Sequence, residues 1–254
     1  MLITVLGAGT ASYAACTIST LSTAPGVWGI ESQGSGPGGL TNYLMQVTFA
    51  GSSPTGTFTG SEWESVGGTI SGPTAISGTW VMVTPASDCE GTMTVTSPSK
   101  QTFQFSINNS GKGANIVQTD TGYTQAGFMV AQGTVTCSNL LFKNKQLSLY
   151  SYGNIPAVGG LVTGEGELKW GATGTTFTTA PNVILDLGAA GNFIVPGSGT
   201  SSISANCTGS GTLTVPSLGS SGTFNVDTVI VDGGKEALWI VTNSGDNVVG
   251  TFLQ

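Results

Sequence analysis

The sequence contains no histidine and no arginine, and charged residues of every kind are scarce. Charged side chains make up 7% of the 254 residues, with six basic against 13 acidic, which gives a net charge of −7. Without histidine, Ser-His-Asp and Cys-His nucleophile systems are excluded, together with most zinc, copper and haem ligation. Because binding to phosphate depends on Arg and Lys, the sequence predicts no nucleic-acid partner.

Helical and catalytic signatures are also missing. No segment of ten or more residues has convincing helical spacing, and no stretch approaches the ~20 apolar residues of a membrane-spanning helix. P-loop, Rossmann and Gly-x-Ser-x-Gly motifs do not occur in a strand-to-helix setting, so the many glycine pairs indicate turns. Ser-Lys catalysis needs a desolvated lysine, whereas Lys100, Lys112 and Lys235 lie in polar, turn-like segments. We therefore expect a protein that is not an enzyme and that has no cofactor and no metal.

An internal repeat organises what is present. Cys16 and Cys137 are 121 positions apart, as are Gly39 and Gly160. Further along, the offset becomes 118 for the other cysteine pair and then 123 for a set of matched residues near the end of each copy: Lys112/Lys235, Ala114/Ala237, Thr119/Thr242, Gly122/Gly245 and Gly127/Gly250. This period far exceeds the ~20–50 residues of a solenoid or propeller repeat. The sequence therefore predicts two duplicated domains, 15–132 and 137–254, joined by a short linker over 133–136.

The first residues have features of an export signal. Leu2–Leu6 is a short apolar run, and Ser12-Tyr13-Ala14 is a small-x-small arrangement suited to cleavage before Ala15. A positively charged segment is missing at the start, so an ordinary first strand is the alternative. We interpret residues 1–14 as the remnant of a signal peptide, which predicts a secreted, periplasmic or cell-surface location.

Four cysteines in an exported chain indicate disulfides. Each copy holds one cysteine of each kind, so pairing within copies, Cys16–Cys89 and Cys137–Cys207, preserves the equivalence of the copies. Each bond closes a loop of about 70 residues and adds ~4 kcal/mol on the chain-entropy model. Zinc is the rival, but the sequence has no Cys-x-x-Cys and no histidine to complete such a site.

Alternation with period two predicts half-buried antiparallel strands. Phe103, Phe105 and Ile107 alternate with polar residues, and Met93 and Val95 share a face. Turn-forming segments separate such runs, and in the second copy Asp232–Glu236 between the runs Thr228–Val231 and Ala237–Thr242 predicts a hairpin. With 39% hydrophobic residues and 40 glycines, the composition fits short strands and tight turns better than disorder. We predict an all-β fold of two tandem, antiparallel, up-and-down β-barrels, with a β-sandwich as the alternative.

The back half of each copy carries a family resemblance. The segments that carry it are Cys207–Val215, Val229–Glu236 and Ile240–Thr242, with Asp88–Val95 and Ile116–Asp120 as their more divergent counterparts. They resemble a recurring module of secreted bacterial proteins that is frequent in acidobacterial and proteobacterial genomes. The resemblance implies export and a small lipocalin-like β-barrel, and it implies no activity and no functional residues.

Two pairs of carboxylates are candidate catalytic groups. Glu62 and Glu64 flank Trp63, and Glu165 and Glu167 precede Trp170. Residues i and i+2 of a strand share a face about 7 Å apart, a spacing that glycosidases use. However, the pairs occupy non-equivalent positions in the two copies. We therefore interpret them as structural and keep a carboxylate-based glycan hydrolase as the less favoured alternative.

Tryptophans give the best indication of binding. If each copy is a barrel, inward aromatic side chains are able to line a small apolar cavity, although eight strands leave just enough room for side chains to fill the interior. The candidate ligand-binding residues are Trp28, Trp63, Trp80, Trp170 and Trp239.

The sequence thus supports a non-catalytic, exported tandem-barrel protein that acts by binding. The partner would be a small apolar molecule, a carbohydrate or an envelope protein. The alternative is a structural subunit that self-associates in an extracellular or cell-surface assembly, since low charge and Ser/Thr/Gly-rich strands suit packing between subunits.

Overall fold

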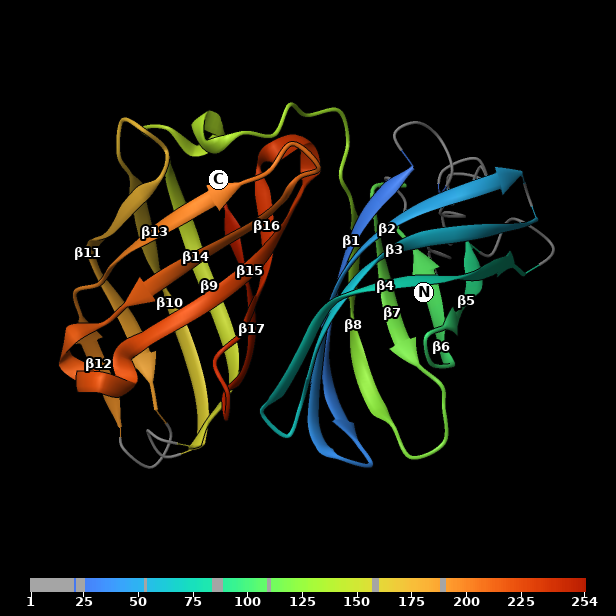
Figure 1. Cartoon of the computed structure of the whole chain (residues 1–254), viewed down its shortest axis with the longest axis horizontal. Helices are drawn as coiled ribbons and strands as arrows, with labels where there is room; N and C mark the ends of the chain where they lie inside the picture. Colours follow the sequence, from blue (N-terminus) through green and yellow to red (C-terminus); the bar gives the residue numbers. More distant parts are fainter. Residues whose placement is uncertain are drawn as a thin grey trace, which may run out of the picture.

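The structure is a computed structural model that describes residues 21, 26–52, 54–83, 89–108, 111–156, 160–187 and 191–254. Within these residues the chain forms two closed, eight-stranded antiparallel β-barrels that lie side by side (Figure 1). The predicted all-β fold of two tandem antiparallel barrels is confirmed. The segment interpreted as a signal remnant, 1–14, lies outside the described residues.

Barrel 1 is an up-and-down meander. Each strand pairs with the next, and the last strand pairs back to the first, with Trp28 opposite Ala131. Its strands are β1 (Val27–Gly36), β2 (Gly39–Ser52), β3 (Thr55–Val66), β4 (Thr69–Met82), β5 (Glu90–Ser97), β6 (Gln101–Ile107), β7 (Gly113–Gln118) and β8 (Thr124–Ala131).

Barrel 2 repeats this meander with one addition. The added strand is the short β12, which pairs with the end of β11, whereas β13 pairs with its beginning. The barrel is closed because β17 pairs with β9 and β10 pairs with β11. Its strands are β9 (Gln146–Ile155), β10 (Gly160–Trp170), β11 (Thr176–Asp186), β12 (Asn192–Val195), β13 (Ser198–Ile203), β14 (Thr208–Thr214), β15 (Thr223–Val231), β16 (Glu236–Val241) and β17 (Asn247–Leu253).

Helical structure in the described part of the chain is limited to short 3₁₀ segments. They include η3 (Asn139–Phe142), η6 (Pro216–Gly222) and η7 (Asp232–Gly234), and η7 forms the turn of the predicted hairpin between β15 and β16. No helix among these residues has the length and apolar character needed to cross a bilayer.

Strand pairing reproduces the sequence repeat. In barrel 1, Phe49 faces Phe58, which faces Gly78 on the next strand. A side chain on Gly78 would collide with the Phe58 ring and with a backbone carbonyl, so glycine is required there. Barrel 2 contains the same cross-strand row with the same constraint, made of Trp170, Phe177 and Gly199.

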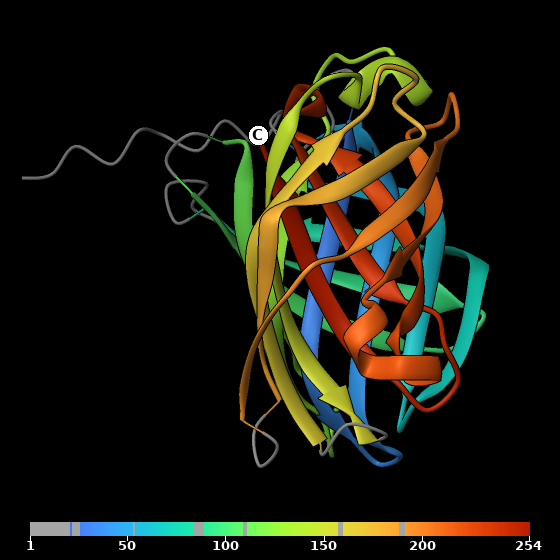
Figure 2. The ribbon, with the colours of Figure 1, turned by 90° about the vertical axis from the view of Figure 1, so that its left-hand side faces the viewer.

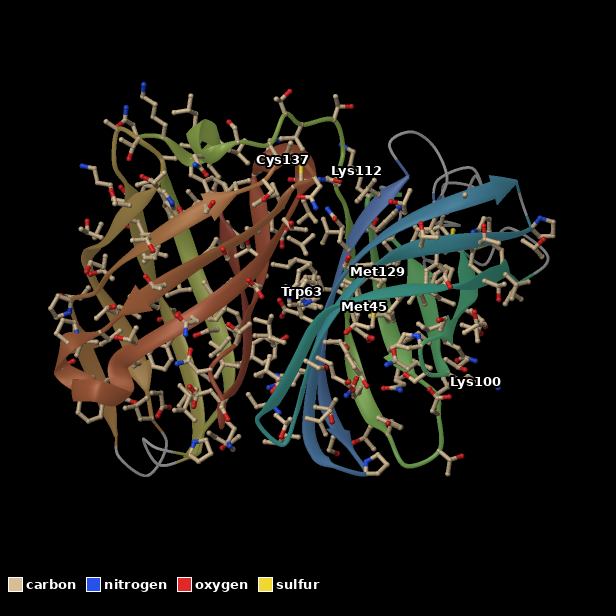
Figure 3. All side chains as sticks on the ribbon, in the orientation of Figure 1. Met45, Trp63, Lys100, Lys112, Met129 and Cys137 are labelled. Carbon is tan, nitrogen blue, oxygen red and sulfur yellow. A yellow bond between two sulfur atoms is a disulfide. The ribbon has the colours of Figure 1, made fainter. Side chains whose placement is uncertain are left out.

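The barrels meet through an apolar contact. Leu44 and Trp63, on the outer face of barrel 1, pack against the outer face of β15–β17 in a cluster with Val229, Val231, Leu238, Ile240 and Val249. Trp63 lies in this seam (Figure 3). Gly29 allows the close approach, because a Cβ there would lie 2.6 Å from Val231 Cγ1.

Hydrogen bonds surround this apolar contact. The Tyr152 hydroxyl donates to Glu31 Oε1 at 2.8 Å, and Asn247 Nδ2 donates to the Leu40 carbonyl at 2.6 Å. The Gly245 amide donates to the Gly68 carbonyl at 2.8 Å. The two barrels therefore share one continuous interface.

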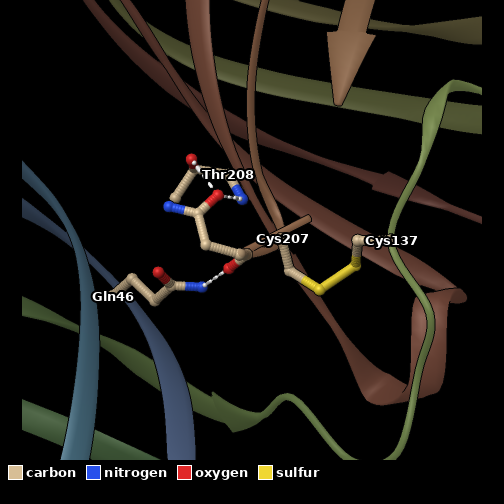
Figure 4. Close-up of a disulfide and its surroundings, with 5 residues drawn as sticks. Gln46, Cys137, Cys207 and Thr208 are labelled. Atoms are coloured by element: carbon tan, nitrogen blue, oxygen red, sulfur yellow. Dashed lines mark hydrogen bonds between the residues drawn. A yellow bond between two sulfur atoms is a disulfide. The ribbon is translucent and has the colours of Figure 1, made fainter. Parts of the chain in front are cut away.

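The disulfide between Cys137 and Cys207 lies next to this interface (Figure 4). Their Cα atoms are 5.1 Å apart, and the pairing predicted for the second copy is confirmed. The neighbouring Asn206 carbonyl accepts a hydrogen bond from Gln46 Nε2 of barrel 1 at 2.8 Å. Cys89 is also disulfide-bonded, but Cys16, its predicted partner, lies outside the described residues.

Candidate ligand site

The interior of barrel 2 contains an apolar cavity. Its volume is about 70 Å³. The wall includes Phe142, Leu149, Leu168, Trp170, Phe177, Leu213, Phe224, Val226, Trp239 and Phe252.

Aromatic rings form a connected set on this wall. Trp170 lies 4.9 Å from Phe177, 5.2 Å from Phe142 and 5.9 Å from Phe252, measured between ring centroids. Phe252 stacks on Trp239 at 5.5 Å with the rings 16° from parallel. Two of the five candidate tryptophans, Trp170 and Trp239, therefore lie on one cavity.

The cavity arises where barrel 2 has smaller side chains than barrel 1. In barrel 1, Met93 faces Phe103, and both are completely or almost completely buried. At the corresponding pair in barrel 2, Gly211 faces Val226. Thr228 likewise stands 123 positions after Phe105. Gly211, Val226 and Thr228 all line the cavity, so the missing side-chain volume accounts for its position.

Two short 3₁₀ segments contribute to the cavity wall. Phe142 comes from η3, which lies across the upper end of barrel 2, and Leu218 comes from η6 near the lower end (Figure 2). Phe142 is buried. Apolar residues from η3 and η6 therefore add to a wall that is otherwise built by strands.

Polar groups on the wall are few and mostly paired. Trp170 Nε1 donates to Ser201 Oγ at 3.0 Å, and Ser151 Oγ donates to the Gly164 carbonyl at 3.3 Å. Trp239 Nε1 is buried and has no hydrogen-bond partner among the described residues. The described residues that line the cavity include no charged side chain.

Barrel 1 uses its tryptophans differently. Trp28 and Trp80 are 1% exposed and lie within its hydrophobic core. Trp28 Nε1 donates to the Leu21 carbonyl at 3.3 Å, and Trp80 Nε1 donates to the Ala50 carbonyl at 3.1 Å. Both rings therefore act as packed core residues with satisfied donors.

Trp63, the fifth candidate, lies outside both barrel interiors. It belongs to the cluster between the barrels, and its Nε1 has no hydrogen-bond partner at close distance among the described residues. The nearby Asp227 carboxyl has its pKa raised by burial, an effect that the Trp63 N–H opposes. The structure does not bring Trp63 to the cavity.

The carboxylate pairs differ in environment. Glu165 and Glu167 are exposed, while Leu168 and Trp170 point into barrel 2, as expected. Glu62 instead lies inside barrel 1 at 5% exposure, opposite Met45. The pKa of Glu62 is raised to about 7, mainly by burial and in smaller part by the charge of Glu64, while a hydrogen bond from Gln101 opposes the rise.

These buried polar groups of barrel 1 have no polar counterparts in barrel 2. Gln101 and Gln118 point into barrel 1, and the residues 123 positions later are Phe224 and Val241 on the wall of the apolar cavity. Sequence reasoning missed this contrast. A comparison of the two copies, position by position, would have found it.

Comparisons with known proteins add little. No protein-family model matches the chain, and no curated protein matches it. Among solved structures, the chain is similar to "Crystal structure of CghA with Sch210972" at a TM-score of 0.27 and 8% sequence identity, over 89% of this chain and 86% of CghA. A likeness at this level carries no argument about function. The resemblance to secreted bacterial modules stays a prediction.

Proposed function

We propose that the protein is a non-catalytic, exported binding protein whose second barrel holds a small apolar molecule. The cavity of about 70 Å³ among the rings of Trp170, Phe177 and Trp239 is the observation that carries this proposal. A concave, aromatic-lined space is the usual form of a site for a small apolar ligand.

The character of the wall supports binding without catalysis. Acid–base or nucleophilic chemistry needs a titratable or activated group within reach of the ligand. The described lining residues supply apolar side chains, small hydroxyls and the indole N–H groups of Trp170 and Trp239, none of which is a titratable acid or base. Export is supported by the disulfides, because such bonds persist mainly in oxidising compartments.

A toluene titration tests the proposal. Toluene is an uncharged aromatic molecule that fits a small hydrocarbon cavity, and Trp170 and Trp239 on the wall report its arrival through their emission. We expect a saturable change in tryptophan fluorescence with a Kd on the order of 1 mM or tighter.

A substitution copied from the first barrel provides the matching variant. Val226→Phe places in barrel 2 the residue that barrel 1 has at the equivalent position, Phe103, and so fills the cavity. We expect toluene binding to weaken at least ~10-fold while thermal unfolding shifts by only a few degrees. Val117→Phe, the same change on an exposed outer face, is the control and should bind toluene normally. Unaltered binding by the Val226 variant would rule out this cavity as the site.

A further inference from the structure

The unpaired indole nitrogen of Trp239 indicates which chemical group the ligand carries. Resting on the proposed function, we infer that the ligand is a neutral apolar molecule with a hydrogen-bond acceptor such as a carbonyl oxygen, and that Trp239 Nε1 donates to it. A pure hydrocarbon would leave this donor unpaired, and a carboxylate would bring an uncompensated charge into the barrel.

The position of the Trp239 ring is tightly determined. Its strand neighbour is Gly250, where a Cβ would lie 2.7 Å from Trp239 Cζ2 and 2.8 Å from Trp239 Cε2, so the indole occupies the space above the glycine. Phe252 stacks on the ring with only 16° between the planes. Both neighbours therefore hold the indole, and with it the N–H, in one orientation.

The missing partner distinguishes Trp239 from the other described tryptophans that point into a barrel. Trp28, Trp80 and Trp170 each donate their Nε1 proton to an oxygen of the protein. A buried donor without an acceptor costs about 1–3 kcal/mol. At the position equivalent to Trp239, barrel 1 has Ile116, which carries no polar atom. An apolar side chain therefore suits this position in the fold, and the tryptophan adds a donor that the fold itself does not use.

The lack of charged side chains on the cavity wall indicates that the ligand is uncharged. The described lining residues include no lysine to balance a carboxylate and no acid to balance an amine. Burying an unpaired ion costs several kcal/mol, far more than a single hydrogen bond returns. A ketone, aldehyde, ester or ether retains the acceptor without this penalty.

Two ligands of the same shape separate the hydrogen bond from apolar packing. Acetophenone and α-methylstyrene differ only in a C=O group in place of a C=CH₂ group. Calorimetry gives the Kd of each for the wild-type protein and for Trp239→Phe, which keeps an aromatic ring and removes the N–H. Because the hydration of each free ligand is the same in both titrations, the change in the Kd ratio reports the Trp239 contact alone.

We expect Trp239→Phe to weaken acetophenone binding about 10-fold relative to α-methylstyrene. Trp170→Phe removes an N–H that already has an acceptor, so it should change both affinities together and preserve the ratio. In ¹H–¹⁵N spectra of the wild-type protein, acetophenone should shift one protected indole N–H signal that α-methylstyrene leaves in place. Benzoate, the charged relative, should not bind.

The outcomes distinguish this inference from the function on which it rests. If wild-type protein and Trp239→Phe bind both ligands with the same Kd ratio, and no indole signal responds specifically to acetophenone, the hydrogen bond is overturned while binding in the barrel stands. If benzoate binds as tightly as acetophenone, the requirement for neutrality is wrong. If neither neutral ligand binds to the wild-type protein, the proposed function fails together with the inference.

Discussion

The two barrels share a pair of facing positions, one on each of two strands. The tryptophan stands at one of these positions in barrel 1 and at the other in barrel 2. In barrel 1, Trp80 on β4 meets Phe49 on β2 edge-to-face at 6.4 Å. In barrel 2, the residue equivalent to Phe49 is Trp170, and the residue equivalent to Trp80 is Ser201. Trp170 reaches across and donates to the Ser201 hydroxyl. The two copies therefore fill the same space from opposite strands, and the exchange keeps each indole N–H paired.

Glu31 is a second residue whose surroundings are unusual. It is completely buried between the barrels, where its Oε1 accepts from the Tyr152 hydroxyl and its Oε2 has no partner among the described residues. The pKa of Glu31 is raised to about 8, mainly by burial; the Tyr152 hydrogen bond opposes this rise, and the charge of Glu236 adds to it. At neutral pH this carboxyl is therefore protonated.

The raised pKa predicts a pH dependence of stability. The native carboxyl binds its proton up to about pH 8, whereas the unfolded one releases it near the ordinary value of 4.5. The native state thus holds more protons between these values, so the contribution is complete below pH 4.5 and is lost as pH rises through 8. Glu31→Gln removes this titration, so it should reduce the slope of unfolding free energy against pH. It should also stabilise the protein by on the order of 3 kcal/mol at pH 7.

Urea unfolding at several pH values measures the effect of Glu31→Gln. Glu165→Gln, on the solvent face of β10, is the control and should leave the curve of stability against pH unchanged. An equal slope in the wild-type protein and the Glu31 variant would show that Glu31 is ionised in the folded protein.

At the scale of elements, the outer faces of β15–β17 distinguish barrel 2 from barrel 1. Ile240 is completely buried against barrel 1, whereas Val117, its equivalent on β7, is 43% exposed. Ser106 and Asn115 similarly stand where barrel 2 has Val229 and Leu238. The same strands of the fold are therefore amphipathic in one copy and apolar on both faces in the other.

Substitution at these two equivalent positions tests the importance of the contact. Ile240→Asp buries a charge in the seam, so it should cost about 3 kcal/mol or more or separate the barrels. Val117→Asp places the same charge on a surface that water reaches, and should change the free energy of unfolding by less than ~1 kcal/mol. Thermal unfolding and small-angle scattering report stability and separation. An equal loss of unfolding free energy in the two variants would mean that the contact between the barrels does not stabilise the protein.

The alternation of single strands was readable from the sequence, but the contact between barrels was not. Phe103, Phe105 and Ile107 point inward as the period-two pattern predicts. The continuous apolar run Ala237–Val241 indicates a strand buried on both faces. Its hairpin was predicted, yet the run alone does not say which surface covers its outer side.

The candidate site was harder to predict because it depends on differences of volume. Gly211, Val226 and Thr228 lie on two neighbouring strands, and each is unremarkable within its own strand. They border one space with Trp170 because closure of the barrel brings β10 to the same interior, while Trp239 is the direct strand neighbour of Thr228. Glu62 shows a related limit, since spacing places it on the same face as Glu64 without telling whether that face points inward.

At the scale of the whole molecule, the interface joins unlike surfaces. Barrel 1 contributes the side that carries Leu44 and Trp63, and barrel 2 contributes the outer side of β15–β17. Such a contact between repeated units continues into a filament only when each unit offers both surfaces. The corresponding side of barrel 1 carries Ser106 and Asn115 instead of valine and leucine, so it does not offer the second surface.

We therefore expect the chain to remain a single copy in dilute solution. Size-exclusion chromatography with light scattering should give a mass near 25.5 kDa, independent of concentration over the micromolar range. A stable dimer or larger species would instead favour the structural-assembly alternative.

The bond between Cys137 and Cys207 turns the first half of barrel 2 into a covalent ring. Every turn between β9 and β13, including the one around Gly174 that joins β10 to β11, lies inside this ring. A protease that cuts such a turn opens the ring without releasing a fragment, and the two new ends remain held by strand pairing on both sides. In an oxidising environment rich in proteases, the barrel with the cavity can thus be cut once and still remain one molecule.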